Sequence, residues 1–222
     1  MSIVIAVDGT AASGKGTLAK KLARHFGFAH MDSGALYRLT ALAVMEAKGD
    51  PAVEADALRG AQAIDLSRAG DPAIRTDLIG QASSQVAAIP TVREALKDFQ
   101  KSFVEHPPGG SAGAVMDGRD IGTVICPSAT AKLFVDAAPR VRALRRLLEL
   151  QKLGIAREEE DLLAELNARD KADRERPVSP LRQADDAALL DTTDLDIDRA
   201  FAAALALVQP KIEAALKVRH RG

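Results

Sequence analysis

The stretch that decides the fold of this chain reads Gly9-Thr10-Ala11-Ala12-Ser13-Gly14-Lys15-Gly16-Thr17. It follows an apolar run at residues 3–7 and leads into a helical pattern. A glycine-rich turn in that place lets backbone N–H groups surround phosphate oxygens, and the start of the next helix adds partial positive charge. The spacing is that of the phosphate loop G-x-x-x-x-G-K, with one glycine inserted before the threonine. We therefore expect these residues to bind a nucleoside triphosphate, with Lys15 on its phosphates and the Thr17 hydroxyl on Mg²⁺.

Apolar runs alternate with helical patterns along most of the chain. The runs expected as strands are residues 3–7, 28–31, 114–116, 131–136 and 188–190. Their unbroken apolarity indicates strands that are buried on both faces. Helical spacing of apolar residues follows at residues 16–26, 34–48, 76–88, 92–105, 139–153, 158–174 and 197–218. The alternation predicts a P-loop NTPase-type α/β fold, a doubly wound parallel five-stranded sheet with helices on both faces.

The composition excludes several classes of protein. The 222 residues are 47% hydrophobic, enough for a sizeable core, and the net charge of −1 gives no global attraction for nucleic acid or an anionic membrane. The one cysteine, Cys126, allows no disulfide within the chain, which fits a cytoplasmic protein. The histidines show no metal-ligand spacing, and we expect neither a signal peptide nor a membrane span.

A second polar signal follows the apolar run that ends at Met116. Asp117 comes at the end of an expected strand, where a carboxylate can hold Mg²⁺ directly or through water. An Asp-Gly turn after a strand is common, so the signal is weak alone. It gains weight because Arg119 and Asp120 follow at once, at the ligand-binding end of such a sheet.

A third signal is the charged stretch at residues 169–176, which ends before Pro177. Three of its arginines, Arg169, Arg174 and Arg176, suit phosphate oxygens because guanidinium groups bind them bidentately. The stretch is also compatible with a solvated helix face carrying pairs such as Asp170–Arg174. With a phosphate loop upstream we favour a hinged lid. A further basic cluster is interpreted as mostly solvated, although one member could cover a nucleotide base; it comprises Arg140, Arg142, Arg145 and Arg146.

A fourth signal lies at residues 32–38. Ser33 precedes a helical pattern, where a serine commonly caps the helix, and Arg38 follows about one turn into it. A cap is the structural interpretation of Ser33, and a phosphate clamp is the functional interpretation of Arg38.

These motifs resemble the bacterial cytidylate kinase family of nucleoside monophosphate kinases nearly end to end. The resemblance rests on residues 9–17, 32–38, 84–93, 117–123 and 169–181. The Gly-Lys-Gly-Thr variant is typical of nucleoside monophosphate kinases, whereas Ser-Gln-Val-Ala-Ala and Asp-Gly-Arg-Asp are more specific to the cytidylate branch. The resemblance implies an enzyme of pyrimidine nucleotide metabolism that transfers the γ-phosphoryl of ATP to CMP, and to dCMP as well, with Mg²⁺. It also implies a monomer.

The resemblance assigns a cytosine site to Ser84, Arg93 and Asp120. The exocyclic amine of cytosine can donate to a carboxylate, and its ring acceptors can take hydrogen bonds from an arginine. Uracil carries a carbonyl in place of that amine, so Asp120 would face an acceptor with no proton between them. This chemistry predicts a preference for CMP over UMP.

The remaining roles follow the matching positions. Ribose contacts are implied for Arg169 and Asp173. Stabilisation of the transferred phosphoryl group is implied for Lys15 and Arg174. The clamp on the acceptor's α-phosphate is implied for Arg38, Arg119 and Arg176, and Ser33 is a further substrate-binding position. The groups expected to act in catalysis are Lys15, Arg119, Arg169, Arg174 and Arg176.

One departure from the family concerns the monophosphate-binding insertion. Residues 63–75 are short and loop-like, so we expect a reduced insertion at about residues 56–93 without its small sheet, within a single kinase domain at residues 1–222. The lid is expected at about residues 158–182. Two alternatives remain: a P-loop kinase for another small acceptor, such as UMP or AMP, or a switch protein that hydrolyses ATP. Neither needs Asp120 with Arg93, and the chain offers no clear glutamine to position water for a switch.

Overall fold

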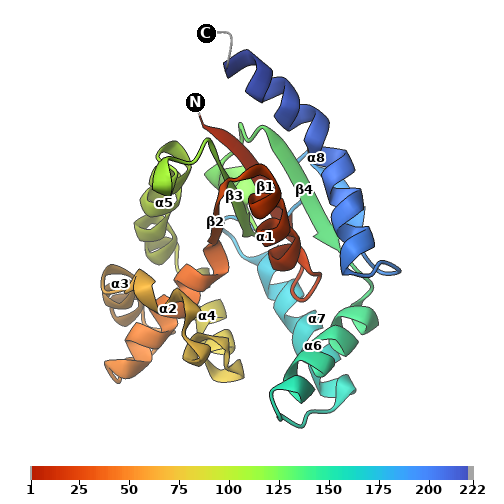
Figure 1. The fold of residues 1–222 in the computed structure, drawn as a ribbon. Coiled ribbons are helices and arrows are strands. Elements are labelled where there is room, and N and C mark those ends of the chain that lie inside the picture. Colours follow the sequence, from red (N-terminus) through yellow and green to blue (C-terminus); the bar gives the residue numbers. More distant parts are fainter. Residues whose placement is uncertain (1, 220–222) are drawn as a thin grey trace. The chain divides into compact units, whose positions relative to one another are not determined.

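The chain divides into two compact units. The computed structural model describes residues 2–219. One unit, here called the sheet unit, takes the chain up to Met31 and from His106 onward; the other, the helical unit, spans Asp32–Glu105 (Figure 1). None of the helices in the described part combines the length and apolarity needed to cross a lipid bilayer.

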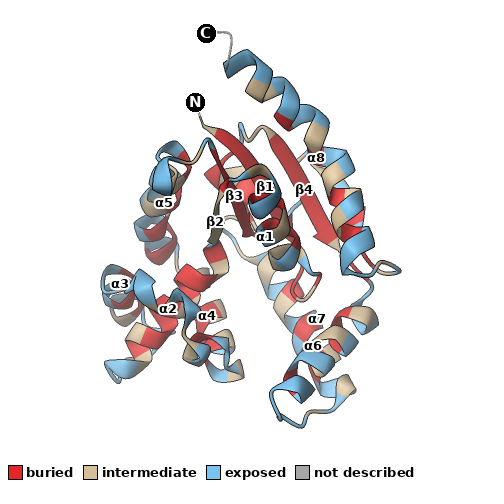
Figure 2. Ribbon diagram, in the orientation of Figure 1, coloured by how far each residue is buried: buried red, intermediate tan, exposed pale blue. Residues whose placement is uncertain are grey.

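The five predicted strands are all present and form one parallel sheet. Their order is β2-β3-β1-β4-β5. Their bounds are β1 (Ile3–Gly9), β2 (Ala29–Asp32), β3 (Gly113–Gly118), β4 (Ala131–Asp136) and β5 (Ala188–Asp191). β1 lies in the centre, where Ile5 pairs with Val115 on one side and with Ala131 on the other. The three central strands are almost wholly buried, as their continuous apolar sequences predicted (Figure 2).

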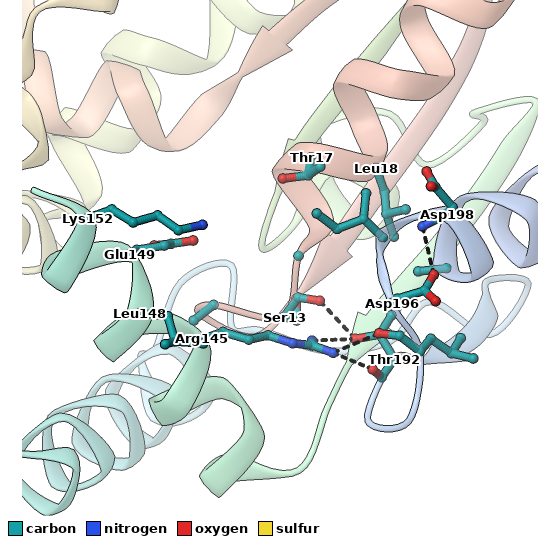
Figure 3. Close-up of a pocket in the computed structure, with 15 residues that line it drawn as sticks. Ser13, Thr17, Leu18, Arg145, Leu148, Glu149, Lys152, Thr192, Asp196 and Asp198 are labelled. Atoms are coloured by element: carbon teal, nitrogen blue, oxygen red, sulfur yellow. Dashed lines mark hydrogen bonds between the residues drawn. The ribbon is translucent and has the colours of Figure 1, made fainter.

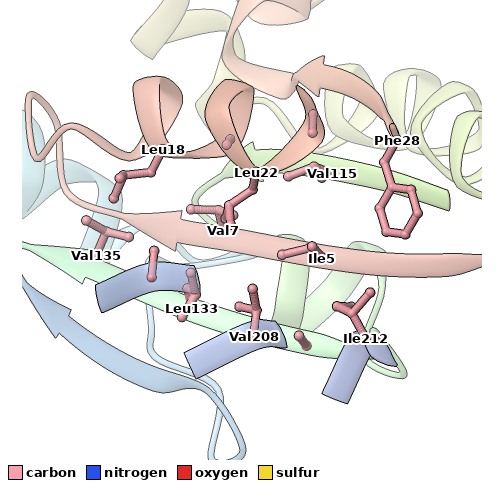
Figure 4. Packing of buried hydrophobic residues seen from close by; sticks show 14 of the residues in the cluster. Ile5, Val7, Leu18, Leu22, Phe28, Val115, Leu133, Val135, Val208 and Ile212 are labelled. Carbon is pink, nitrogen blue, oxygen red and sulfur yellow. The ribbon is translucent and has the colours of Figure 1, made fainter. Parts of the chain in front are cut away.

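One face of the sheet is covered by two helices, α1 (Lys15–Phe26) and α8 (Ile197–Arg219). Leu18 and Leu22 of α1 reach down onto Val7 of β1 (Figure 4). α8 contributes a stripe at four-residue spacing, the helical period that keeps side chains on one face. Its members are Ala200, Ala204, Val208 and Ile212. Helices therefore lie around a parallel sheet, as predicted.

The opposite face of the sheet carries a short π-helical turn at Ile121–Ile125. Alternate residues of a strand point to opposite faces, so Asp8 points away from the core that Val7 joins. The Asp8 carboxylate accepts hydrogen bonds from the backbone N–H groups of Ile121 (2.8 Å) and Gly122 (2.7 Å). A buried carboxylate on β1 thus anchors the turn that directly follows Asp120.

Two further helices of the sheet unit, α6 (Pro139–Lys152) and α7 (Glu159–Glu175), pack against each other. Their shared apolar cluster includes Leu150 of α6 and Leu162 of α7, and it extends to Ala11 of the phosphate loop. This packing brings the charged end of α7 into the part of the molecule that holds the loop.

The helical unit contains α2 (Ser33–Glu46), α3 (Glu54–Gln62), α4 (Asp77–Ala88) and α5 (Pro90–Glu105). Short 3₁₀ turns join α3 to α4, and no strand is assigned from Ser33 to Glu105, all of which is described. The structural interpretation of Ser33 as the cap of α2 does not hold. The cap is Asp32, whose side chain accepts from the Ala35 N–H at 3.2 Å, and Ser33 is buried in the first turn.

The turn from β1 into the phosphate loop requires glycine. Gly9 has a φ of 154°, and a Cβ there would stand 2.0 Å from the Val135 carbonyl oxygen of the neighbouring strand. Gly14 has a φ of 88°, but a Cβ there would meet nothing within 4 Å. We expect Gly9→Ala to lower the free energy of unfolding by about 4 kcal/mol, whereas Gly14→Ala lowers it by about 1–2 kcal/mol from backbone strain alone. Denaturant unfolding of both variants checks this, and equal losses would contradict the steric explanation.

Candidate functional site

The phosphate loop has the backbone geometry that its sequence predicted. The loop begins at Gly9, the last residue of β1, and ends at Gly14. Gly14 has a left-handed backbone conformation and is the N-cap of α1. Ala12 is also left-handed, with a φ of 57°. Lys15 is half-buried, and its ammonium group donates to the Thr10 carbonyl at 3.4 Å. Thr17 is exposed in the first turn of α1, where its hydroxyl can reach a bound cation.

Polar residues at the ends of neighbouring strands hold this loop in place. The Thr10 hydroxyl donates to Asp136 at the end of β4 (2.6 Å). The Thr192 hydroxyl, just after β5, donates to the Ser13 carbonyl (3.0 Å). The Ser13 hydroxyl donates in turn to the Thr10 carbonyl (3.0 Å). The loop is therefore supported at the carboxyl edge of the sheet, where open α/β sheets bind their ligands.

A pocket of about 560 Å³ adjoins the loop within the sheet unit. Its walls include Ser13 and Thr17 of the loop, Leu148 and Lys152 of α6, and the segment that leads into α8 (Figure 3). This volume is in the range that nucleotide-sized ligands occupy. The pocket is largely apolar with a few polar groups at its rim, and it opens beside the phosphate loop, so it can take the base and sugar of a bound nucleotide.

The interpretation of the basic cluster on α6 as mostly solvated is wrong for two of its members. Arg145 lines the pocket and donates to the Thr192 hydroxyl (3.0 Å) and to the carbonyls of Thr192 (2.6 Å) and Leu195 (3.2 Å). Arg142 is buried and contacts the phosphate loop, as described below. Arg140 is exposed and pairs with Glu160, as a solvated residue would. The charge pattern of the helix sequence did not show that Arg142 is buried and Arg145 lines the pocket while Arg140 is exposed.

Asp117 lies at the end of β3 on the same face of the sheet as α1. Its carboxylate is buried and contacts His30 at 2.8 Å. A Cβ on Gly16 would come within 3.3 Å of it, so the carboxylate is next to the start of α1. Mg²⁺ in phosphate-transfer sites is usually held by few protein groups together with phosphates and water. Thr17 and Asp117 fit that chemistry.

The structure brings four of the predicted site residues into one largely buried cluster. Arg119 donates through Nε to Asp173 at 2.8 Å, and Arg176 lies 3.6 Å from Asp173 and 3.9 Å from Asp120. Burial opposes ionisation of Asp173, but the charges of Arg119, Arg169 and Arg176 and the hydrogen bond from Arg119 outweigh it and lower its pKa. Likewise, burial favours neutral Arg119, but Asp173 raises the pKa of its guanidinium. Arg119 and Asp173 are therefore both charged at neutral pH.

The two other arginines of residues 169–176 differ in their position relative to this cluster. Arg169 is half-buried, and its charge acts on Asp173. Arg174 is exposed on α7 and is not brought into the cluster. The Arg176 guanidinium also donates to the Ser179 carbonyl (2.6 Å), which holds the chain where α7 ends.

The alternative of a solvated helix face with an Asp170–Arg174 pair does not hold for Asp170. Its side chain is buried and pairs with Arg142 of α6 at 2.5 Å. It also accepts a hydrogen bond from the Ala11 N–H at 3.2 Å. The pair Asp170–Arg142 joins α6, α7 and the phosphate loop.

Three of the predicted site residues of the helical unit donate to backbone carbonyls of that unit. Arg38 donates to the Ile74 carbonyl (2.8 Å) and lies beside Gly80, whose carbonyl accepts from Ser84 (3.3 Å). Arg93 is buried, donates to the Ala87 carbonyl (3.2 Å) and lies over the Tyr37 ring at 5.3 Å. Each guanidinium is thus held by a carbonyl of its own unit.

Sequence reasoning missed Asp8, although its place at the end of a buried strand was a usable signal. Burial raises the pKa of Asp8 from 3.8 to about 6. The hydrogen bonds from Gly122 and Ile121 stabilise the carboxylate and lower this pKa, but they do not outweigh burial. The nearby charge of Asp120 raises the pKa further. The anchor of the turn after Asp120 therefore begins to take up a proton just below neutral pH.

The raised pKa of Asp8 predicts a pH dependence of stability. Between pH 6 and pH 4 the folded protein binds a proton at Asp8 that the unfolded chain does not, so lowering the pH favours the folded state through this group. From pH 7 to pH 4, the free energy of unfolding of the unmodified chain should rise by up to about 3 kcal/mol relative to that of Asp8→Asn, because asparagine cannot bind this proton. Urea unfolding of both proteins across this range measures the difference, and a difference that stays constant would contradict the buried, charged Asp8.

Comparisons with known proteins agree on one family. A family model described as "Cytidylate kinase" matches residues 5–210. The chain is 51% identical over 207 residues to "Cytidylate kinase" of Nitrobacter winogradskyi, covering 93% of this chain and 96% of that protein. It is 48% identical over 220 residues to "Cytidylate kinase" of Bradyrhizobium diazoefficiens, covering 99% and 100%.

Solved structures with a similar fold include other small-molecule kinases. The shikimate kinase from Bacteroides thetaiotaomicron superposes with a TM-score of 0.51 at 14% identity, covering 94% of this chain and 99% of that one. A gluconokinase from Sinorhizobium meliloti 1021 gives a TM-score of 0.50 at 14% identity, covering 97% and 96%. At this identity the likeness concerns the fold alone.

Proposed function

The chain belongs to the cytidylate kinase family, and from this premise we propose that it transfers the γ-phosphoryl group of ATP to CMP, giving ADP and CDP. The observation that carries the proposal is that one unit holds both the phosphate loop and a buried arginine–aspartate cluster. A loop for the donor's phosphates and arginines for a second anion are what phosphoryl transfer between two nucleotides requires. dCMP is included as an acceptor, since family resemblance implies it.

The donor is assigned to the phosphate loop and the pocket beside it. Backbone N–H groups of the loop bind the β- and γ-phosphates, and Lys15 neutralises their charge. The pocket beside Arg145 takes the adenosine part. When bound, Mg²⁺ neutralises the donor phosphates, and Thr17 would hold it with Asp117 nearby.

Transfer needs positioning and charge neutralisation more than covalent chemistry. An oxygen of the CMP phosphate attacks the γ-phosphorus in line, and the bond to the ADP oxygen breaks without a phosphoenzyme. No general base is needed, because a phosphate monoester is largely deprotonated near pH 7. The arginines and Lys15 offset the repulsion between two anions and stabilise charge on the transferred group.

Family resemblance implies acceptor contacts within each unit. In the sheet unit these are Asp120 on the cytosine amine, Arg169 and Asp173 on the ribose, and Arg119 and Arg176 on the phosphate. In the helical unit they are Ser84 and Arg93 on the base, Arg38 on the phosphate, and Ser33 as a further substrate-binding residue. Support comes from the match of each position to the family motifs and from the burial of Asp120 and Arg93, since buried polar groups discriminate strongly between bases. Arg174 is assigned to the transferred phosphoryl group.

The organisation of the protein is part of the same proposal. Residues 56–93 act as a reduced monophosphate-binding insertion, and residues 158–182 act as a lid, which includes α7. The protein works as a cytoplasmic monomer on small nucleotides, without nucleic acid. The single cysteine and the near-neutral net charge fit this view.

Measuring ADP formation with separate acceptors tests the proposal. Mg·ATP is supplied with CMP, dCMP, UMP, AMP or no acceptor. Rapid turnover with CMP and little with UMP is the expected result, because Asp120 cannot pair with uracil. Equal turnover with UMP would mean a broader pyrimidine kinase. ADP formation without any acceptor would favour an ATP-hydrolysing switch protein and would contradict the proposal.

A further inference from the structure

Two buried charged residues, Arg142 and Asp170, have no part in the chemistry assigned above. Their side chains are 3% and 2% exposed, and their charged groups meet at 2.5 Å. Arg142 comes from α6 and Asp170 from α7, so the pair crosses between two helices. Replacing a buried ion pair by apolar residues is often neutral or stabilising, so stability alone is a weak reason for this one.

Both members of the pair hold the same residue of the phosphate loop. Asp170 accepts from the Ala11 N–H (3.2 Å), and Arg142 donates to the Ala11 carbonyl (3.1 Å). Arg142 also donates through Nε to the Ala137 carbonyl (2.8 Å), just after β4. The guanidinium therefore ties the middle of the loop to the sheet, and the carboxylate ties it to α7.

The backbone next to this contact is strained. Ala12 has a φ of 57°, a left-handed conformation that costs a non-glycine residue about 1–2 kcal/mol. Such conformations persist where the surrounding structure fixes them. With the Ala11 N–H and carbonyl both held, the peptide that enters Ala12 has little freedom to relax into an ordinary conformation.

We propose that Arg142 and Asp170 are positioning residues that hold the phosphate loop in its phosphate-binding conformation. They do not touch the substrate; they hold the backbone at Ala11, whose own N–H is bound to Asp170, and so orient the loop's other N–H groups before ATP arrives. The inference rests on the proposed function for the identity of the ligand, and on the contacts at Ala11 for the mechanism. Without the pair, part of the binding energy of ATP is spent on ordering the loop.

The test removes both charges without leaving one unpaired. In Arg142→Met with Asp170→Leu, apolar side chains of similar length replace the ion pair. The backbone groups of Ala11 and Ala137 lose these partners, so the melting temperature should fall, but circular dichroism should show that the fold persists. The Kd for ATP, measured by titration calorimetry without acceptor, should rise by about 100-fold, since small misplacements of binding groups have effects of that order. kcat should fall with it, while KM for CMP changes far less.

A matched control is the ion pair Arg140–Glu160, which is exposed and involves the same two helices. Arg140→Gln with Glu160→Gln should leave the Kd for ATP unchanged. If the double variant does not fold, Arg142→Lys is the variant that tests the inference. Lysine keeps the charge but cannot reach Asp170 and both carbonyls at once. It too should weaken ATP binding while the protein stays folded.

A folded variant that binds ATP within threefold of the unmodified protein would overturn the inference. So would an equal loss of ATP affinity in the surface control. Because ATP binding is measured without acceptor, these outcomes are independent of whether CMP is the substrate. The unmodified protein's failure to phosphorylate CMP would instead count against the proposed function.

Discussion

Replacing Lys15 by alanine should lower kcat for CMP phosphorylation by about 1000-fold, because it removes the charge that stabilises the transferred phosphoryl group. The side chain is half-buried beside the loop that cradles the phosphates, and its ammonium group already lies 3.4 Å from the Thr10 carbonyl. A positive charge that meets the transferred phosphoryl group as its negative charge develops contributes more to the transition state than to binding. KM for ATP should therefore change much less than kcat.

Lys20 provides the control for this prediction. It lies on the same helix, α1, but is exposed and away from the loop. Lys20→Ala should leave kcat and KM close to those of the unmodified protein. A Lys15→Ala variant that retains a tenth or more of the original kcat would mean that another group carries the charge neutralisation.

Replacing Asp120 by asparagine should reduce the preference for CMP over UMP by at least about 100-fold. The carboxylate offers only acceptors, which suit the amine of cytosine, whereas an amide can turn either an acceptor or a donor towards the base. kcat/KM for CMP should fall and that for UMP should rise. KM for ATP should stay within about twofold, because Asp120 is not part of the phosphate loop.

Asp161→Asn is the matched control, since Asp161 is exposed in the first turn of α7. It should change neither acceptor preference nor turnover. Steady-state kinetics with both acceptors measures all three proteins. Loss of activity with CMP and UMP alike, at unchanged preference, would show that Asp120 supports the turn at Ile121–Ile125 rather than reading the base.

The fold could be predicted because its signals are local. Each strand of the central sheet is a continuous apolar run, and the phosphate loop needs particular residues at fixed spacing for backbone reasons. The positions of Arg119, Asp120, Asp173 and Arg176 in one cluster also agree with expectation. Their resemblance to family motifs carried that prediction, since no local pattern places residues 54 positions apart beside each other.

The parts that could not be predicted depend on burial and on distant partners. Asp170 and Arg142 are 28 positions apart, and Asp8 and Gly122 are 114 apart. In sequence, Arg142 and Asp170 are charged positions of two amphipathic helices, and such positions usually face solvent. Only the packing of α6 on α7 turns one residue of each inward, towards Ala11. Likewise, Asp32 and Ser33 are both good helix caps by type, and the structure selects Asp32.

The most direct test of the central claim follows the phosphoryl group itself. ATP labelled with radioactive phosphorus in its γ-phosphoryl group is mixed with Mg²⁺, CMP and the protein, and the products are separated. The proposed function predicts that the label appears in CDP, in an amount equal to the ADP formed, with none retained on the protein. Label released as inorganic phosphate at the same rate with and without CMP would contradict it.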